Sequence, residues 1–150
     1  MMVAEASTQV RAGADAVRAA VLDPEAYTRG GTKVSRVEVE ERTGDGMLAR
    51  IHGRFGPVRS SILARYTVRG DVVDLDMISG RLRGFHAVFR IDPRPAEGTV
   101  TLTHREEYDF GYGPLTPLVE RLLRGWARRS VEAEVEALRL AAEEAAGPHT

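Results

Sequence analysis

The chain has 150 residues, of which 43% are hydrophobic and 29% are charged, enough for one domain (residues 1–150) with its own core. The 21 Lys and Arg residues are balanced by 22 Asp and Glu residues, which argues against a nucleic-acid-binding protein. The absence of cysteine excludes disulfides, thiolate zinc sites, Fe–S clusters and thiol nucleophiles. The apolar runs are too short to span a membrane, and residues 1–9 show no signal-peptide pattern. We therefore expect a cytoplasmic protein.

The N-terminal part of the chain predicts one strand followed by two short helices. Residues 3–10 are expected to form the strand, and the apolar spacing over residues 13–22 favours a helix with one buried face. Asp23-Pro24 ends that helix and can start a second short turn that reaches Tyr27. Gly30-Gly31 is expected to break the chain before the next element.

The middle of the chain, residues 32–110, alternates apolar and polar side chains with the period of strands. Its turn signals are Thr43-Gly44-Asp45-Gly46, Phe55-Gly56-Pro57 and Arg69-Gly70-Asp71. We expect a strand at 85–91, a loop with two prolines at 92–98 and a last strand at 99–110. Six consecutive strands joined by short turns predict an antiparallel meander.

The end of the chain predicts one helix of roughly 30 residues, capped by Thr116 and Pro117 and stopped by Gly147-Pro148, with a frayed tail at 147–150. One side carries Arg121, Arg124, Arg128, Glu132, Glu136, Arg139 and Glu143. The opposite side carries Val119, Trp126, Ser130, Ala133, Ala137 and Ala141, flanked by Leu122, Leu123 and Leu140. The alanines either let the helix pack closely on the sheet or line a space that a ligand fills.

Two segments carry a resemblance to a known superfamily. The opening STQVRAGADAVRAAVLDPEAY and the later EEYDFG (residues 106–111) resemble the START-like (Bet v 1-like, SRPBCC) superfamily, closest to its polyketide cyclase/dehydrase and lipid-transport branch. Ala12-Gly13 stands where that family usually has Ala-Pro, and the 6% aromatic content is low for its aromatic polyketide cyclases. The resemblance implies an α+β helix-grip fold: a curved antiparallel sheet of about seven strands wrapped on the C-terminal helix, with an internal cavity.

Strand alternation nominates the side chains that would line such a cavity. The inward phase set by Val100 and Leu102 also carries His104, Glu106 and Tyr108. The phase of residues 60–68 is ambiguous, because hydrophobicity points Arg65 outward whereas the resemblance points it inward. The predicted ligand-binding residues are Tyr27, Arg65, Leu75, Met77, Phe85, Phe89, His104, Glu106, Tyr108, Trp126 and Ser130.

Three of these residues are candidates for chemistry. An inward Arg65 would bind a carboxylate, enolate or phosphate, with Glu106 as its internal partner. His104 and Glu106, two apart on one strand face, are suited to acid–base catalysis, or form a core or solvated pair without a catalytic role. Tyr27 either contacts the ligand or fixes its short helix, and Trp126 is expected in the cavity wall or core.

Three functions follow from these observations. The first is binding of a small hydrophobic molecule, lipid- or polyketide-like, between the sheet and the C-terminal helix. The second is a cyclase or dehydrase acting on a ligand there, and the third is a protein-interaction module that uses Arg121, Arg124 and Arg128. The histidines show no metal-ligand spacing and no nucleotide-binding motif occurs, so we expect no cofactor or metal. The sequence is compatible with a monomer or a homodimer.

Overall fold

The computed structural model describes residues 1–29 and 32–147 of the chain. The elements are β1 (Met2–Val10), α1 (Ala14–Val21), α2 (Pro24–Tyr27), β2 (Val34–Thr43), β3 (Gly46–Phe55), β4 (Val58–Arg69), β5 (Val72–Ser79), β6 (Gly84–Arg94), η2 (Pro95–Glu97), β7 (Thr99–Asp109), η3 (Gly113–Leu115) and α3 (Thr116–Ala146). The predicted break at Gly30-Gly31 and the predicted tail beyond residue 147 fall outside the described residues.

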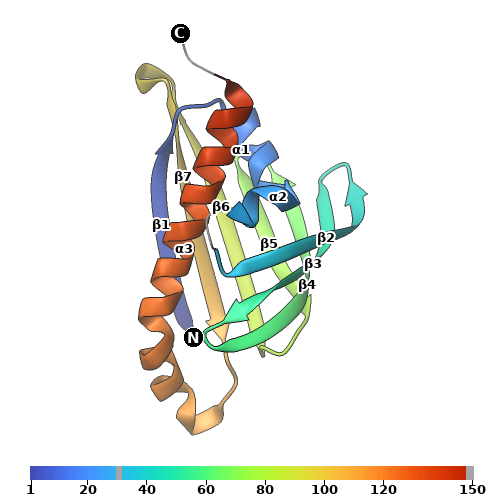
Figure 1. The fold of residues 1–150 in the computed structure, drawn as a ribbon, viewed down its shortest axis with the longest axis vertical. Helices are drawn as coiled ribbons and strands as arrows, with labels where there is room; N and C mark the ends of the chain where they lie inside the picture. The colour runs from blue at the N-terminus through green and yellow to red at the C-terminus, as the bar shows by residue number, and fades with distance from the viewer. Residues whose placement is uncertain (30–31, 148–150) are drawn as a thin grey trace.

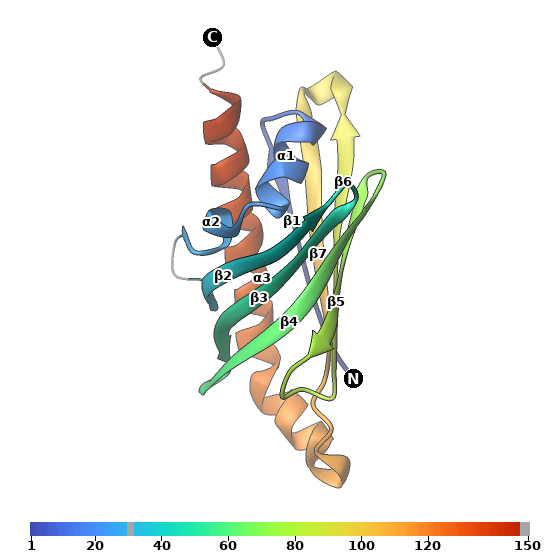
Figure 2. The same cartoon turned by 90° about the vertical axis from the view of Figure 1, so that its right-hand side faces the viewer.

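The seven strands form one antiparallel sheet in the order β1-β7-β6-β5-β4-β3-β2. Figure 1 shows α3 running along the face of β1 and β7, with α1 and α2 beside its C-terminal half. The view turned by 90° shows β2, β3 and β4 sweeping out of the plane of the other strands toward α3 (Figure 2). The helix-grip architecture expected from the sequence is therefore confirmed.

The predicted turns connect the strands at the expected positions. Thr43 pairs with Gly46 across the first turn, and Phe55 pairs with Val58 across the second. Gly56, in that second turn, has a φ of 60°, a left-handed conformation that favours glycine. These tight connections explain why consecutive strands are neighbours in the sheet.

Alternation along β7 and β4 decides which side chains face the interior. Val100, Leu102, His104, Glu106 and Tyr108 of β7 are all buried, as predicted, whereas their neighbours are more exposed. Full burial of an aliphatic side chain such as Leu102 contributes about 1.5–3 kcal/mol. In β4 the buried set is Ile62, Ala64 and Tyr66, which is the set that hydrophobicity favoured.

The buried stripe of α3 differs from the predicted one. Ser130 and Ala137 are buried as expected, but Leu122 is 72% exposed and Leu140 is 42% exposed. The buried residues of the helix are Ala127, Ser130, Val131, Glu134, Val135, Ala137, Leu138 and Ala142. The prediction was wrong because alanine and leucine occur on several sides of this helix, so hydrophobicity alone fixes its rotation poorly.

Two predicted boundaries were also wrong. Thr116 is the first residue of α3 rather than its cap, because the turn η3 already brings the chain into a helical path. The predicted loop at 92–98 is partly strand, since Pro93 pairs with Val100 and Arg94 with Thr99. Pro93 is tolerated because the pairing of β5 with β6 ends at Arg90. Beyond that point β5 offers no partner for the backbone N–H that proline lacks.

Candidate functional site

A cavity of about 40 Å³ lies on the inner face of the curved sheet and is lined mainly by strand residues. Its lining residues are Tyr27, Lys33, Val34, Val37, Ile51, Gly53, Arg54, Phe55, Ile62, Tyr66, Leu75, Phe85, Phe89, His104, Glu106 and Glu134. Among them Glu134 is the one contribution of α3, so strands and α2 enclose most of the space. A buried water needs about 10–15 Å³, so this cavity holds a few waters and must widen for a larger ligand.

The polar end of the cavity is a cluster of four ionisable side chains, which we call the buried quartet: Lys33, His104, Glu106 and Glu134. Their side chains are 7%, 1%, 3% and 3% exposed, respectively. They come from three parts of the chain: the residue before β2, alternate positions of β7, and the middle of α3. The fold therefore brings together charges that are far apart in the sequence.

Lys33 connects the two carboxylates of the quartet. Its ammonium donates a hydrogen bond to Oε1 of Glu106 and lies 3.1 Å from Oε1 of Glu134. It also donates to the hydroxyl oxygen of Tyr108 at 3.0 Å, and that hydroxyl in turn donates to Glu106 at 2.6 Å. The ammonium lies 5.9 Å from the centroid of the Trp126 ring, within the range of a cation–π contact.

His104 occupies the other side of the same carboxylates. Its Nε2 lies 2.8 Å from Glu134 and 3.4 Å from Glu106, and its Nδ1 lies 3.3 Å from the backbone oxygen of Val88. Both ring nitrogens thus lie near acceptor oxygens, an arrangement that suits the doubly protonated imidazolium, which donates from both nitrogens. The ring stacks on Phe89 with centroids 4.1 Å apart, which fixes its plane.

Charge pairing outweighs burial at this cluster. Burial alone would lower the pKa of His104, but its contacts with Glu106 and Glu134 raise that pKa to about 9. Burial alone would raise the pKa of Glu106, but Lys33 and His104 lower it to about 2. Burial also opposes the charge of Lys33, and the two glutamates nevertheless raise its pKa well above the ordinary value. The quartet therefore holds two cationic side chains, Lys33 and His104, against the carboxyl groups of Glu106 and Glu134.

Three members of the quartet also have the composition of a metal site. Ligand atoms of His104, Glu106 and Glu134 all lie within 4.8 Å of one another. However, Lys33 and the imidazolium already neutralise the two carboxylates, and a metal would have to displace a proton from His104. The geometry therefore favours an ionic cluster over a metal centre.

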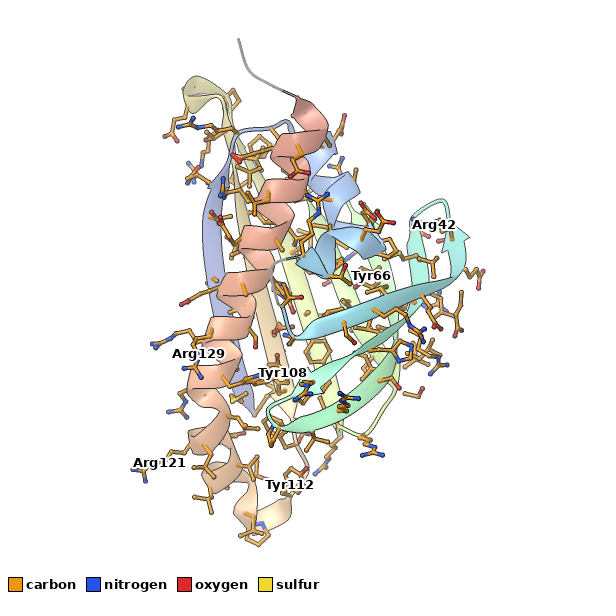
Figure 3. All side chains as sticks on the ribbon, in the orientation of Figure 1. Arg42, Tyr66, Tyr108, Tyr112, Arg121 and Arg129 are labelled. Carbon is orange, nitrogen blue, oxygen red and sulfur yellow. The ribbon has the colours of Figure 1, made fainter. Side chains whose placement is uncertain are left out.

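The structure brings six of the predicted ligand-binding residues to the cavity wall: Tyr27, Leu75, Phe85, Phe89, His104 and Glu106. Tyr27 lines the cavity, and its hydroxyl donates to the backbone oxygen of Val21, so it ties α2 to α1 as the second of its two predicted roles requires. Tyr108 is buried behind Glu106, and Figure 3 shows it with Tyr66 in the interior, whereas Arg121 and Arg129 point outward from α3.

Four other predicted residues do not line the cavity. Met77 is half-buried at the edge of the core, and Ser130 is buried under α3. The Trp126 ring packs on the Phe55 ring with centroids 6.2 Å apart, so this side chain belongs to the core. Arg65, whose direction the sequence left open, is exposed on the outer face of β4, so the inward alternative with Glu106 as its partner is wrong. The reason is strand alternation: Ala64 and Tyr66 take the inward positions on either side of it.

Sequence reasoning missed Lys33 and Glu134. Lys33 is the only lysine in the chain, and the rest of the 21 Lys and Arg residues are arginines. That choice is informative, since lysine offers a compact point charge where arginine offers a wide planar fork. Glu134 follows Val131 and precedes Val135 and Leu138, so a carboxylate within an otherwise apolar stripe was its only signal.

The alanines of α3 support close packing. Ala127, Ala137 and Ala142 are buried, and none of the three lines the cavity. The α3 helix packs mainly against β1 and α1. Of the two interpretations of the alanine-rich helix, the structure favours the one in which small side chains allow close approach.

A family model for polyketide cyclase/dehydrase and lipid transport proteins matches residues 1–143. The chain belongs to this family. This match confirms the resemblance inferred from the opening segment and from residues 106–111. Comparison of the sequence with curated proteins gives no match. Within residues 1–29 and 32–147, no helix is long and apolar enough to cross a membrane.

Solved structures show the same fold at low sequence identity. A protein from Thermus thermophilus superposes with a TM-score of 0.84 and 14% identity, over 97% of this chain and 99% of that one. A START superfamily protein from Mycobacterium smegmatis gives a TM-score of 0.75 and 14% identity, with 97% and 99% coverage. The Zhui aromatase/cyclase from a Streptomyces species gives 0.76 and 21% identity, with 98% of each chain covered. These similarities concern the fold.

Proposed function

We propose that this protein binds a small, mostly apolar molecule in the cavity, with a polar group of that molecule directed at the buried quartet. The observation that carries the proposal is the asymmetry of the cavity wall. Aliphatic and aromatic side chains of β2–β6 form most of it, and four of the five charged lining residues are the clustered members of the buried quartet. Family membership and the structural similarity to a START superfamily protein support the same function.

The size of the cavity sets a condition on this function. At about 40 Å³ the space is smaller than any lipid or polyketide, so binding requires β2 or α2 to move away from the rest of the sheet. Tyr27 on α2 and Val34 and Val37 on β2 are the lining residues that such a movement would displace. The free protein is then a closed state, and ligand affinity includes the free energy of opening.

Mass spectrometry under native and denaturing conditions tests the proposal directly, because a ligand carried through purification gives an adduct that denaturation removes. Titration with 1-octanol supplies a defined probe. Val37→Phe, which fills the cavity wall, is expected to reduce octanol affinity at least about tenfold. Val3→Phe, at a 41% exposed position of β1, is the matched control and should bind as the unmodified protein does. Equal binding by both variants would contradict the proposal.

Enzymatic activity of the cyclase/dehydrase type is a second candidate, and the protonated His104 is the observation that favours it. An imidazolium and an ammonium at the end of an apolar cavity stabilise negative charge on an enolate oxygen. Ring closure with dehydration would appear in a β-keto thioester assay as a product lighter by one water. His104→Gln should abolish that product while leaving octanol binding measurable. Unchanged turnover in this variant would remove His104 from the reaction.

A further inference from the structure

A second, larger recess opens on the surface next to the cavity. This arginine groove has a volume of about 1030 Å³. Its lining residues are Thr32, Lys33, Ser35, Arg36, His52, Gly53, Arg54, Arg59, Ser60, Ser61, Gly80 and Arg81. Five of these twelve residues are cationic and none is acidic, in a chain whose net charge is −1. The groove is therefore a local concentration of positive charge.

Most of this charge has no internal partner among the described residues. Arg36 is paired with Glu38 at 2.5 Å. Arg54, Arg59 and Arg81 are exposed, and no carboxylate of the described residues lies within 4.0 Å of any of them. They come from β3, β4 and the loop between β5 and β6, so three separate segments direct guanidinium groups to one recess. Elsewhere on the surface arginines commonly have such partners, for example Arg139 with Glu143 at 2.7 Å.

The groove and the cavity adjoin each other. They share Lys33, Gly53 and Arg54 as lining residues. At Gly53 the two backbones are in close contact, since a Cβ placed there would lie 2.3 Å from the carbonyl oxygen of Lys33. A molecule that reached both spaces would have its apolar part in the cavity and its outer end among the arginines.

We propose that the arginine groove binds a phosphate ester group of the same molecule whose apolar part occupies the cavity. This inference rests on the proposed function for the apolar part only. A phosphate group offers several oxygens and can accept hydrogen bonds from more than one guanidinium at once, whereas one arginine satisfies a carboxylate. Ser61 also lines this recess and offers a neutral donor, whereas the hydroxyl of its neighbour Ser60 is buried.

Calorimetric titration with octyl phosphate and 1-octanol separates the two parts of the site. The unmodified protein is expected to bind octyl phosphate at least about tenfold more tightly than octanol, and added salt should weaken only the former. Arg59→Gln/Arg81→Gln should remove that difference without changing octanol affinity, because neither residue lines the cavity. Arg121→Gln/Arg124→Gln is the matched control, because it removes the same charge from exposed positions of α3 outside the groove.

The outcomes distinguish this inference from the proposed function. Equal affinities for octyl phosphate and octanol would refute phosphate binding in the groove but not ligand binding in the cavity. The same loss of octyl phosphate affinity in both double variants would do so too. Octyl phosphate binding that depends on Arg59 and Arg81, without any octanol binding, would support binding in the groove and refute binding in the cavity. Vesicles of phosphatidylglycerol identify the source of the phosphate: groove-dependent flotation assigns a lipid headgroup, and its absence beside tight octyl phosphate binding assigns a free phosphate ester.

Discussion

Raising the pH should destabilise this protein by discharging His104. The folded protein holds the pKa of His104 at about 9, above the value of 6.5 expected for an unfolded chain. A raised pKa means that the folded state binds the proton more tightly, so the stabilisation is complete below about pH 6.5 and is lost as the pH rises through 9. Each factor of ten in proton affinity is worth about 1.4 kcal/mol, which gives about 3 kcal/mol for the whole interval.

Urea unfolding of the unmodified protein and of His104→Gln, measured between pH 6 and pH 10, checks this value. Glutamine can still donate a hydrogen bond to the glutamates but does not titrate. The variant should be less stable by about 3 kcal/mol at pH 6, and the difference should shrink toward zero near pH 10. A difference in unfolding free energy that stays constant with pH would refute the assignment of a buried imidazolium.

Three further predictions concern neighbouring positions. Lys33→Met leaves two buried carboxylates short of a cation and should cost about 3–5 kcal/mol in urea unfolding at pH 7; a loss below about 1 kcal/mol would contradict the ionic cluster. Gly53→Ala should lower stability by roughly 2 kcal/mol or more because of its close backbone contact, whereas Gly44→Ala, with nothing within 4 Å, should be nearly neutral; equal effects in thermal unfolding would disprove this contact. Arg65→Ala should change octanol affinity less than about twofold, since this side chain is exposed on the outer face of β4; a larger loss in calorimetry would place it back at the cavity.

The strands were predictable because their signals were local. Alternation over residues 99–110 placed His104 and Glu106 inward, and the turn signal at residues 43–46 identified the first hairpin of the meander. In β4 the hydrophobic pattern was right, whereas positional resemblance to the family misplaced Arg65. Side-chain direction in a strand follows from a period of two, so a single well-placed apolar residue fixes it.

The buried quartet was only half predictable, because its other half depends on tertiary structure. The rotation of α3 about its axis decides that Glu134 faces the cavity, and this rotation is set by packing against β1 and α1. Lys33 reaches the quartet because the chain before β2 lies against Gly53, a contact between residues that are distant in sequence. Neither placement leaves a periodic pattern, although a single lysine among so many arginines is a compositional signal.

Because Lys33 is the only lysine, the protein has one side-chain amine, and the closed cavity encloses it. Apart from the N-terminal amine, an acylating reagent has a single target, which is protonated and hydrogen-bonded as long as the quartet is intact. The rate at which Lys33 is acylated therefore reports how often the cavity opens to solvent. Protection by an added compound would identify it as an occupant of the cavity without a radioactive, fluorescent or engineered label.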